Sequence, residues 1–223
     1  MRGESTNVIQ VKIVLREYRL IAFDMDGTII SGFNSWQTLH RHFGVENQTN
    51  LKDYLERKID YSEFMRRDIK LWQPPPHVDE VERVLLDYKF QPHAKRVIKK
   101  LGDLGLKICI ISAGIDIRAK DVGGKLGVKC AVANGLEVDR NGFLTGEGIF
   151  RVELLKKDEA LKKVAESYGF KLDECIAVGD SRFDKSFLSV PGLGVAYRPA
   201  EELVQNADLV IHDLGEILKI FEK

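Results

Sequence analysis

Short apolar runs that alternate with helical patterns limit the fold of this chain more than any other feature. The runs are "LIAFD" at 20–24, "KICIIS" at 107–112, "CAVAN" at 130–134, "CIAVGD" at 175–180, "LGVAY" at 193–197 and "ADLVIHD" at 207–213. Between them, residues 94–101 and 161–168 repeat apolar side chains at the spacing of an amphipathic helix, and a glycine follows each pattern. Strands that alternate with helices form βαβ units. The pattern therefore predicts an α/β fold with a Rossmann-like, mostly parallel sheet.

Other parts of this pattern carry weaker signals. The stretch after Ile117 predicts a helix that Gly123 and Gly124 interrupt. "VDRNGFLTG" at 138–146 predicts a hairpin, because its Asn-Gly pair tolerates positive φ. The segment "VIQVKIV" at 8–14 is compatible with an extra edge strand or with a poorly ordered arm.

One block of the chain, residues 31–91, is helical and follows directly after the first strand. Its longest helix carries an apolar stripe, which "QPPPH" at 73–77 ends, and a shorter helix is predicted around 81–86. The stripe consists of Tyr61, Met65, Ile69 and Trp72. We expect a small helical cap domain at 31–91, inserted into an α/β core domain made of 1–30 and 92–223. Gly32 and Pro92 flank the cap as hinge positions.

Charge and hydropathy exclude several classes of function. The 34 Lys and Arg residues balance 34 Asp and Glu residues, so no global basic field favours nucleic acid. No segment approaches the roughly 18 apolar residues of a membrane span, and the N-terminus lacks a signal-peptide pattern. We expect a cytoplasmic monomer or homodimer that binds neither nucleic acid nor membrane.

The three cysteines lack the spacing of a metal site. Cys109 and Cys175 lie within apolar runs, and Cys130 opens another. An odd number of cysteines in such positions favours reduced thiols that serve as small core residues. We therefore expect all three to be free.

Two acids, Asp24 and Asp26, end the first apolar run. Carboxylates are rarely buried unless they are paired or bound to metal. Two such charges ~4 Å apart repel by about 4 kcal/mol at an effective dielectric constant of 20. The edge of the sheet where this strand ends must therefore supply positive charge or keep one acid protonated.

Several later residues could meet these acids, because the carboxyl ends of parallel strands share one edge of a sheet. Ser112 and Asp180 end later strands, and Asp184 follows four residues on. Lys157 opens a helix. Three carboxylates at a cleft suit Mg²⁺, which prefers oxygen ligands and commonly shares them with a phosphate. A carboxylate can also attack phosphorus as a nucleophile, so the set predicts phosphoryl transfer.

Each residue taken alone has a simpler explanation. Ser112 would be the N-cap residue of a helix, and Lys157 would be a solvated surface lysine. Asp180 would be a helix N-cap residue and Asp184 a surface acid. None of these explanations accounts for the occurrence of all four residues, in this order along the chain, at one edge of the sheet.

The histidines show no catalytic spacing. His40 and His42 lie two residues apart, so they do not share a helix face, and we expect both at the cap surface. His93 is expected in the first turn of a helix.

The sequence resembles the haloacid dehalogenase superfamily, in its phosphoserine-phosphatase-like branch. The motifs are "DMDGT" at 24–28, "IISAG" at 110–114, "KKDEAL" at 156–161 and "VGDSRFD" at 178–184. The resemblance runs from about Arg19 to the end of the chain, with a helical insertion where that branch carries its cap. It implies that Asp24 is the nucleophile and Asp26 the general acid and base. Ser112, with the backbone N–H groups of Ala113 and Gly114, would hold the phosphoryl oxygens.

The resemblance also implies the charge balance of the site. Lys157 would neutralise charge between the nucleophile and the phosphate. Asp24, Asp180 and the backbone carbonyl of Asp26 would bind Mg²⁺, with Asp184 supporting the metal site. The resemblance thus implies an Mg²⁺-dependent phosphomonoester hydrolase that acts on a small phosphorylated metabolite through an aspartyl-phosphate.

Two features depart from phosphoserine phosphatases, namely the residue at position 33 and the last motif, which is "GDSRFD" at 179–184 instead of the usual Gly-Asp-Gly-x-x-Asp. Their cap glutamate, nine residues after the nucleophile, reads the substrate amine, and here that position is Phe33. Arg66 lies roughly where their carboxylate-binding arginine falls, although a solvated helix arginine explains it equally. Trp36 and Trp72 would favour an apolar or ring-containing leaving group if either lines the cleft, and would otherwise pack the cap. Phosphoserine is therefore a doubtful substrate.

Two other functions remain open at this point. A phosphomutase or phosphotransferase of the same fold would give an isomer instead of free phosphate. A non-catalytic phosphoacceptor module would also combine acids, a hydroxyl and a lysine. However, such modules lack an inserted helical cap, and Asp26 would shorten the life of their acyl phosphate.

Overall fold

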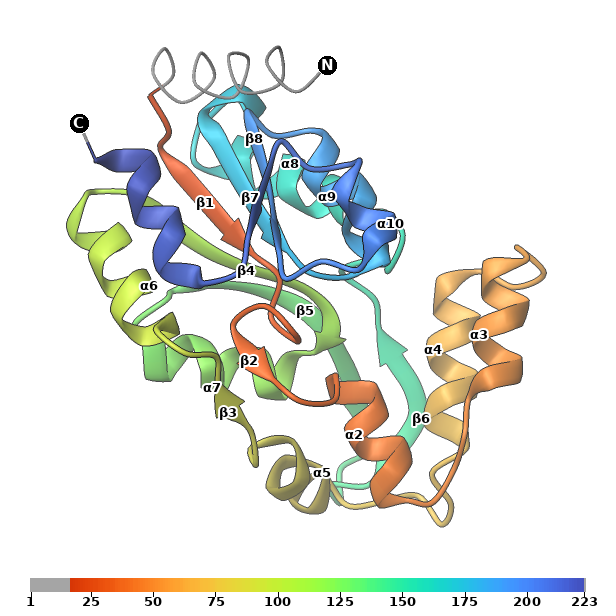
Figure 1. Ribbon diagram of the computed structural model, residues 1–223. Coiled ribbons are helices and arrows are strands. Elements are labelled where there is room, and N and C mark those ends of the chain that lie inside the picture. Colours follow the sequence, from red (N-terminus) through yellow and green to blue (C-terminus); the bar gives the residue numbers. More distant parts are fainter. Residues whose placement is uncertain (1–16, 223) are drawn as a thin grey trace.

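The computed structural model describes residues 17–222, which form a seven-stranded sheet with helices on both faces (Figure 1). The strand order is β6-β5-β4-β1-β7-β8-β9. The strands are β1 (Leu20–Phe23), β4 (Lys107–Ile115), β5 (Cys130–Val138), β6 (Leu144–Ile149), β7 (Cys175–Gly179), β8 (Leu193–Tyr197) and β9 (Leu209–Ile211). Neighbouring strands are parallel except β5 and β6, which form the predicted hairpin. The predicted α/β fold class is confirmed. The ambiguous segment 8–14 lies outside the described residues.

Both faces of the sheet are buried, which explains the uninterrupted apolar runs. In β1, Ile21 and Phe23 belong to one hydrophobic cluster, and Leu20 and Ala22 belong to the other. The first cluster includes side chains from α6 (Ala94–Asp103), α7 (Asp116–Leu126) and the 3₁₀ helix η3 (Leu214–Phe221). The second includes side chains from α8 (Lys157–Ser167), α9 (Lys185–Ser189) and α10 (Glu201–Val204). Short 3₁₀ turns flank β7, namely η1 (Leu172–Glu174) and η2 (Arg182–Asp184). No described helix is long and apolar enough to cross a membrane.

Helix α7 continues through the two glycines that were expected to interrupt it. A side chain at Gly123 would place its Cβ 2.9 Å from the backbone oxygen of Val128, so the helix packs too closely for any larger residue there. The helix ends at Gly127, which adopts the left-handed conformation.

Between β1 and β4 the chain forms the predicted helical block. Its helices are α2 (Ser35–His42), α3 (Gln48–Leu55), α4 (Tyr61–Lys70) and α5 (Val78–Leu85). Two short strands, β2 (Ile30–Ser31) and β3 (Lys89–Phe90), pair antiparallel at the two ends of the block. We expected no strand there, since two-residue strands are too short to show alternation in the sequence. In this article, the cap means residues 31–91, a boundary that stays a prediction.

The cap helices pack against the end of the sheet. A third hydrophobic cluster joins Leu39, Trp72 and Val81 of the cap with Ile115 of β4 and Leu144 of β6. The apolar stripe of α4 thus faces core strands as well as other cap helices. The cap therefore shares its hydrophobic core with the sheet.

The expectation of three free cysteines is wrong for two of them. Cys109 and Cys130 form a disulfide between the neighbouring strands β4 and β5. The register of these parallel strands pairs the two residues directly, with their Cα atoms 4.6 Å apart. Such a pairing depends on strand register, which the spacing of the cysteines in sequence does not reveal. Cys175 is free and buried, as expected.

The expectation for His40 is also wrong. This side chain is buried within the cap, whereas His42 is partly exposed and lies 2.8 Å from a carboxylate oxygen of Glu80. His93 is the N-cap residue of α6, one position before the first turn, and it has a φ of +67°. Burial of His40 requires partners for its ring nitrogens, which are Asp68 and Trp72.

Candidate active site

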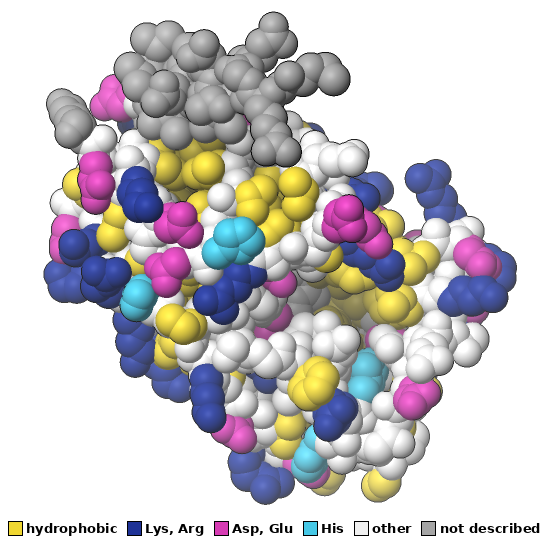
Figure 2. All heavy atoms as spheres, in the orientation of Figure 1, with side chains coloured by type: hydrophobic (Ala, Val, Ile, Leu, Met, Phe, Trp, Pro, Cys, Tyr) yellow, Lys and Arg dark blue, Asp and Glu magenta, His cyan; other side chains and the backbone are white. Residues whose placement is uncertain are grey.

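Functional side chains from several strand ends meet in a cleft between the sheet and the cap. The cleft has a volume of about 360 Å³, and the molecular surface is hollowed between core and cap (Figure 2). Asp24 directly follows β1, Asp180 directly follows β7, and Ser112 lies in β4. Because these three strands are parallel neighbours, their carboxyl ends share one edge.

A lysine bridges two of the buried acids. Lys157, the first residue of α8, donates from Nζ to Asp24 Oδ1 at 2.8 Å and to Asp184 Oδ1 at 2.6 Å. Burial opposes the charge on Lys157, but the attraction of Asp184 and Asp24 outweighs burial and raises its pKa. Burial also raises the pKa of Asp24 well above its usual range, against the lowering effect of Lys157. The Asp24 carboxylate is thus held in one orientation by a cation.

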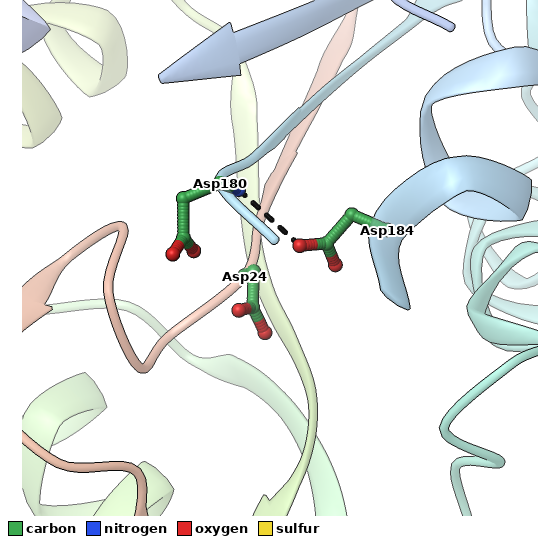
Figure 3. A group of neighbouring side chains, drawn as sticks. All are labelled: Asp24, Asp180 and Asp184. Atoms are coloured by element: carbon green, nitrogen blue, oxygen red, sulfur yellow. Dashed lines mark hydrogen bonds between the residues drawn. The ribbon is translucent and has the colours of Figure 1, made fainter. Parts of the chain in front are cut away.

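Three carboxylates converge at this point (Figure 3). Oxygen atoms of Asp24, Asp180 and Asp184 lie within 4.8 Å of one another. Asp184 is held by the backbone N–H groups of Asp180 and Ser181, at 3.2 and 2.9 Å. Thr28 Oγ1 donates to Asp180 Oδ1 at 2.8 Å. Burial, with the charge of Asp184, raises the pKa of Asp180 to about 6.

The acid cluster has the chemistry of a divalent-cation site. Within the described residues near it, Lys157 is the cation that contacts two of the three acids, so a negative charge remains to be balanced. Carboxylate oxygens are the ligands that Mg²⁺ prefers. The turn at Gly27 leaves room there, because a side chain at this position would overlap the Asp180 carboxylate. The residues present therefore fit a bound divalent metal.

Asp26 is not one of these three clustered acids, although it lines the same cleft, and it has its own partners. Ser35 donates to Asp26 Oδ2 from its backbone N at 3.1 Å and from its Oγ at 3.2 Å. Arg118 Nη1 donates to Asp26 Oδ1 at 3.0 Å, and both side chains are almost completely buried. Burial raises the pKa of Asp26, although Arg118 and Ser35 act against this shift. A buried acid with a raised pKa can hold a proton and deliver it in the cleft.

Residues 112–114 form an irregular part of β4 between the paired positions Ile111 and Ile115, and this loop also lines the cleft. Ser112 Oγ accepts a hydrogen bond from the backbone N–H of Gly114 at 3.1 Å. The backbone oxygen of Ala113 accepts three hydrogen bonds, from Trp36 Nε1, Tyr61 Oη and Asn134 Nδ2, at 3.0, 3.2 and 3.0 Å. A side chain at Gly114 would collide with Ser35 Oγ and crowd Asp26. The loop is therefore fixed by both core and cap.

Several residues of this site were missed by sequence reasoning. Arg118, Ser35, Thr28 and Asn134 all contact the catalytic candidates or the loop beside them. Ser35 lies nine residues from Asp26, and Arg118 lies 92 residues from it. The position of Arg118 just after the end of β4 was a signal that could have drawn attention to it.

The cap residues differ from expectation in position. Phe33 is exposed and its ring lies under the Arg41 guanidinium at 4.3 Å; it is not among the described residues that line the cleft. Arg66 binds Glu63 on its own helix and also lies outside that lining. Trp36 lines the cleft, whereas Trp72 is buried in the cap. Phe33 and Arg66, the two cap positions compared with phosphoserine phosphatases, therefore both lie outside the described cleft lining.

Comparison with known proteins defines the family. The family model of haloacid dehalogenase-like hydrolases matches residues 21–189. This chain therefore belongs to that family, in its phosphoserine-phosphatase-like branch, and is a hydrolase by family.

Several of the similar proteins are named phosphoserine phosphatase. Phosphoserine phosphatase of Methanocaldococcus jannaschii is 32% identical over 92% of this chain and 98% of its own length. The structure titled as a phospho-aspartyl intermediate analogue of phosphoserine phosphatase has a TM-score of 0.78 and 31% identity, over 93% of this chain and 100% of its own. A substrate-bound phosphoserine phosphatase complex has a TM-score of 0.78 and 30% identity over the same shares.

Proposed function

We propose that this protein is an Mg²⁺-dependent phosphomonoester hydrolase that acts on a small phosphorylated metabolite through a phosphoaspartate at Asp24. The observation that carries the proposal is the buried Asp24–Lys157–Asp184 arrangement, beside a separately held Asp26. The names of the relatives support the same class of reaction. A cytoplasmic location and a monomer or homodimer remain predictions from the sequence.

The reaction follows from the positions of two carboxylates. Asp24 attacks phosphorus, the ester P–O bond breaks, and the electron pair leaves on the alcohol oxygen. Asp26 gives that oxygen a proton. In the second half, the Asp26 carboxylate takes a proton from water, whose oxygen attacks phosphorus and releases Asp24 and inorganic phosphate.

Other residues hold the reacting groups. Ser112 and the N–H groups of Ala113 and Gly114 are proposed to bind the phosphoryl oxygens, with Lys157 balancing their charge. Asp24, Asp180 and the backbone carbonyl of Asp26 would hold Mg²⁺, and Asp184 would orient this set. Bound Mg²⁺ supplies charge neutralisation at the phosphate. Arg118 and Ser35 keep Asp26 directed into the cleft.

Phosphate release by purified protein tests the proposal. A screen of phosphorylated amino acids, amino alcohols, sugars, glycolate, nucleotides and p-nitrophenyl phosphate should find turnover that Asp24→Asn removes. Asp26→Asn should slow turnover by roughly 10²–10⁴-fold, as expected for loss of general acid–base catalysis. It should also let phosphoaspartate accumulate on Asp24, which mass spectrometry of acid-quenched protein detects. Covalent phosphate on another residue, or an isomerised ester without free phosphate, would refute the hydrolase mechanism.

A further inference from the structure

Among the described residues that line the cleft, those from the cap include a buried carboxylate and aromatic side chains but no basic residue. The lining residues from the cap include Asn34, Trp36, Asn47, Tyr61, Phe64 and Asp68. Lys157 is the one basic residue among the described residues that line the cleft, and it is paired with Asp24 and Asp184. A substrate carboxylate that entered the cap side would therefore meet no cationic partner among the described cap residues of the lining.

Asp68 supplies the charge of this subsite. Its side chain is 2% exposed and accepts three hydrogen bonds, from His40 Nε2, Asn47 Nδ2 and Asn50 Nδ2, at 3.1, 2.7 and 2.9 Å. Two of these donors are amides, which carry no charge. Whether the third donor, the His40 ring, carries a positive charge thus decides whether the negative charge of Asp68 is balanced.

The contacts of His40 assign it as a neutral ring. Trp72 Nε1 lies 3.0 Å from His40 Nδ1, and an indole N–H can only donate. His40 Nδ1 is therefore the acceptor, so the ring proton is on Nε2 and faces Asp68. The Asp68 carboxylate is stabilised by dipoles while its negative charge stays unbalanced by any described side chain it contacts.

Aromatic faces complete the subsite. Trp36, Tyr61 and Phe64 line the same cleft, and Tyr61 and Trp36 are fixed by their bonds to the Ala113 oxygen. Such faces attract a substrate cation and repel an anion through the ring quadrupole. The carboxylate and the aromatic faces thus favour the same charge on the substrate.

We propose that the leaving group of the substrate is an amino alcohol, which carries a positive charge and no carboxylate. This inference rests on the proposed function and deepens it by naming the substrate class. The cation is placed in the cap subsite near Asp68 and the aromatic rings, while the phosphate lies near Asp24. The relatives are named for phosphoserine, which carries both an amine and a carboxylate; this protein is predicted to disfavour the carboxylate.

Three esters that differ in one group each test the proposal. O-phosphoethanolamine, O-phospho-L-serine and 2-hydroxyethyl phosphate are compared by kcat/KM at constant ionic strength. We expect phosphoethanolamine to exceed phosphoserine by at least about tenfold, because the added carboxylate has no partner. We expect it to exceed the neutral ester by roughly tenfold, because the amine gains the attraction of the carboxylate and the rings.

A variant that removes the charge of Asp68 tests whether the preference for the amine ester depends on this residue. Asp68→Asn should lower the ratio of kcat/KM for phosphoethanolamine over 2-hydroxyethyl phosphate by roughly tenfold. Glu80→Gln removes an acid from the cap surface, outside the cleft lining, and should keep the wild-type ratio. The ratio, not the absolute rate, is compared, and thermal melting verifies that each variant is folded. If Asp68→Asn does not fold, the three esters on the unaltered protein still decide the proposal.

The possible outcomes distinguish a failure of this inference from a failure of the proposed function. Preference for phosphoserine would overturn the inference and leave the phosphatase assignment standing. Loss of that preference in Arg182→Ala would identify Arg182, which lies over the ring of the cleft residue Phe183, as the carboxylate partner. Equal rates on the amine and neutral esters would likewise overturn it. Failure to hydrolyse any ester, including p-nitrophenyl phosphate, would instead refute the proposed function.

Discussion

At the residue scale, each buried acid of this site has a different set of partners, and these partners separate the roles of the acids. Asp24 faces Lys157 and the metal-site acids, whereas Asp26 faces Arg118 and Ser35. Arg118 also donates to the backbone oxygens of Leu85 and Phe33, so one guanidinium connects Asp26 with the cap. Arg118 is therefore a positioning residue for Asp26 as well as a structural one.

Removing Arg118 should be costly. Arg118→Met leaves the Asp26 carboxylate buried without its cation, and breaking such a pair typically costs roughly 3–5 kcal/mol of the free energy of unfolding. Chemical denaturation measures this loss. Lys125→Met, which breaks the more exposed pair with Asp121, is the matched control and should cost at most about 1 kcal/mol. In Asp26→Asn/Arg118→Met the cost should be less than the sum of the single changes. Strict additivity would contradict a direct interaction.

The free cysteine gives a test that depends on pKa. Burial, with the nearby charges of Glu174 and Asp173, raises the pKa of the Cys175 thiol from 9.0 to about 11. Since a raised pKa leaves less thiolate at a given pH, the reactive form at pH 8 is roughly a hundredfold scarcer than for an ordinary thiol. Iodoacetamide at pH 8 should therefore leave Cys175 unmodified in the native protein. In denaturant without reductant, mass spectrometry should find it alkylated while Cys109 and Cys130 stay linked. Alkylation of all three without reductant would exclude the disulfide.

At the scale of elements, the cap and the loop at 112–114 meet at one backbone oxygen, that of Ala113. Trp36 of α2 and Tyr61 of α4 both donate to Ala113 in β4, and Asn134 of β5 adds a third donor from the core. Asn134 is itself fixed, because its Oδ1 accepts from the backbone N–H groups of Arg151 and Val152. Cap position and loop geometry are thus physically linked at Ala113.

A hydroxyl deletion tests this link. Tyr61→Phe keeps the ring in the cleft but removes one of the three donors to Ala113, at a cost of roughly 0.5–1.5 kcal/mol. For a chain of this size we expect the melting temperature to fall by about 2–4 °C per kcal/mol. We expect KM for phosphate esters to rise as well, because the loop beside Ser112 loses a contact with the cap. Tyr54→Phe is the matched control, since its hydroxyl donates to Glu153 instead. An equal rise of KM in both variants would argue against the link at Ala113.

At the scale of the whole molecule, the active site exists only where three separate strand ends and the start of α8 meet. Oxygens of Asp24, Asp180 and Asp184 come within 4.8 Å of one another although the first and last are 160 positions apart in the numbering. One lysine balances part of this charge. Because of the remaining charge, we expect the activity of the folded enzyme to depend on a cation.

Metal removal should therefore abolish activity. Treatment with a chelator is expected to stop phosphate release, and Mg²⁺ in excess of the chelator should restore it. Asp180→Ala should resist rescue at the Mg²⁺ concentration that saturates the unaltered enzyme. Adding Mg²⁺ should also raise the melting temperature of the unaltered protein more than that of Asp180→Ala, because ligand binding to the native state stabilises it. Full activity in excess chelator would contradict the proposed metal site.

The sequence by itself determined the fold class and the edge of the sheet at which Asp24 lies. The uninterrupted apolar run from Leu20 to Phe23 predicts a strand buried on both faces, and such strands belong to sheets covered by helices. A strand of that kind that ends in Asp24 places an acid at the ligand-binding edge of the sheet. These inferences succeed because they depend on local periodicity and on chain order.

The tertiary structure decided the contacts across the sheet and the cap. The disulfide between Cys109 and Cys130 depends on strand register, and the burial of His40 depends on how α2 packs on α4. Arg118 reaches Asp26 because α7 follows β4 at the same edge as the cap. The negative charge of the Asp68 subsite likewise emerges when three cap segments bring uncharged donors together. Such contacts join residues far apart in sequence, and their geometry is set by side-chain packing, which local patterns do not encode.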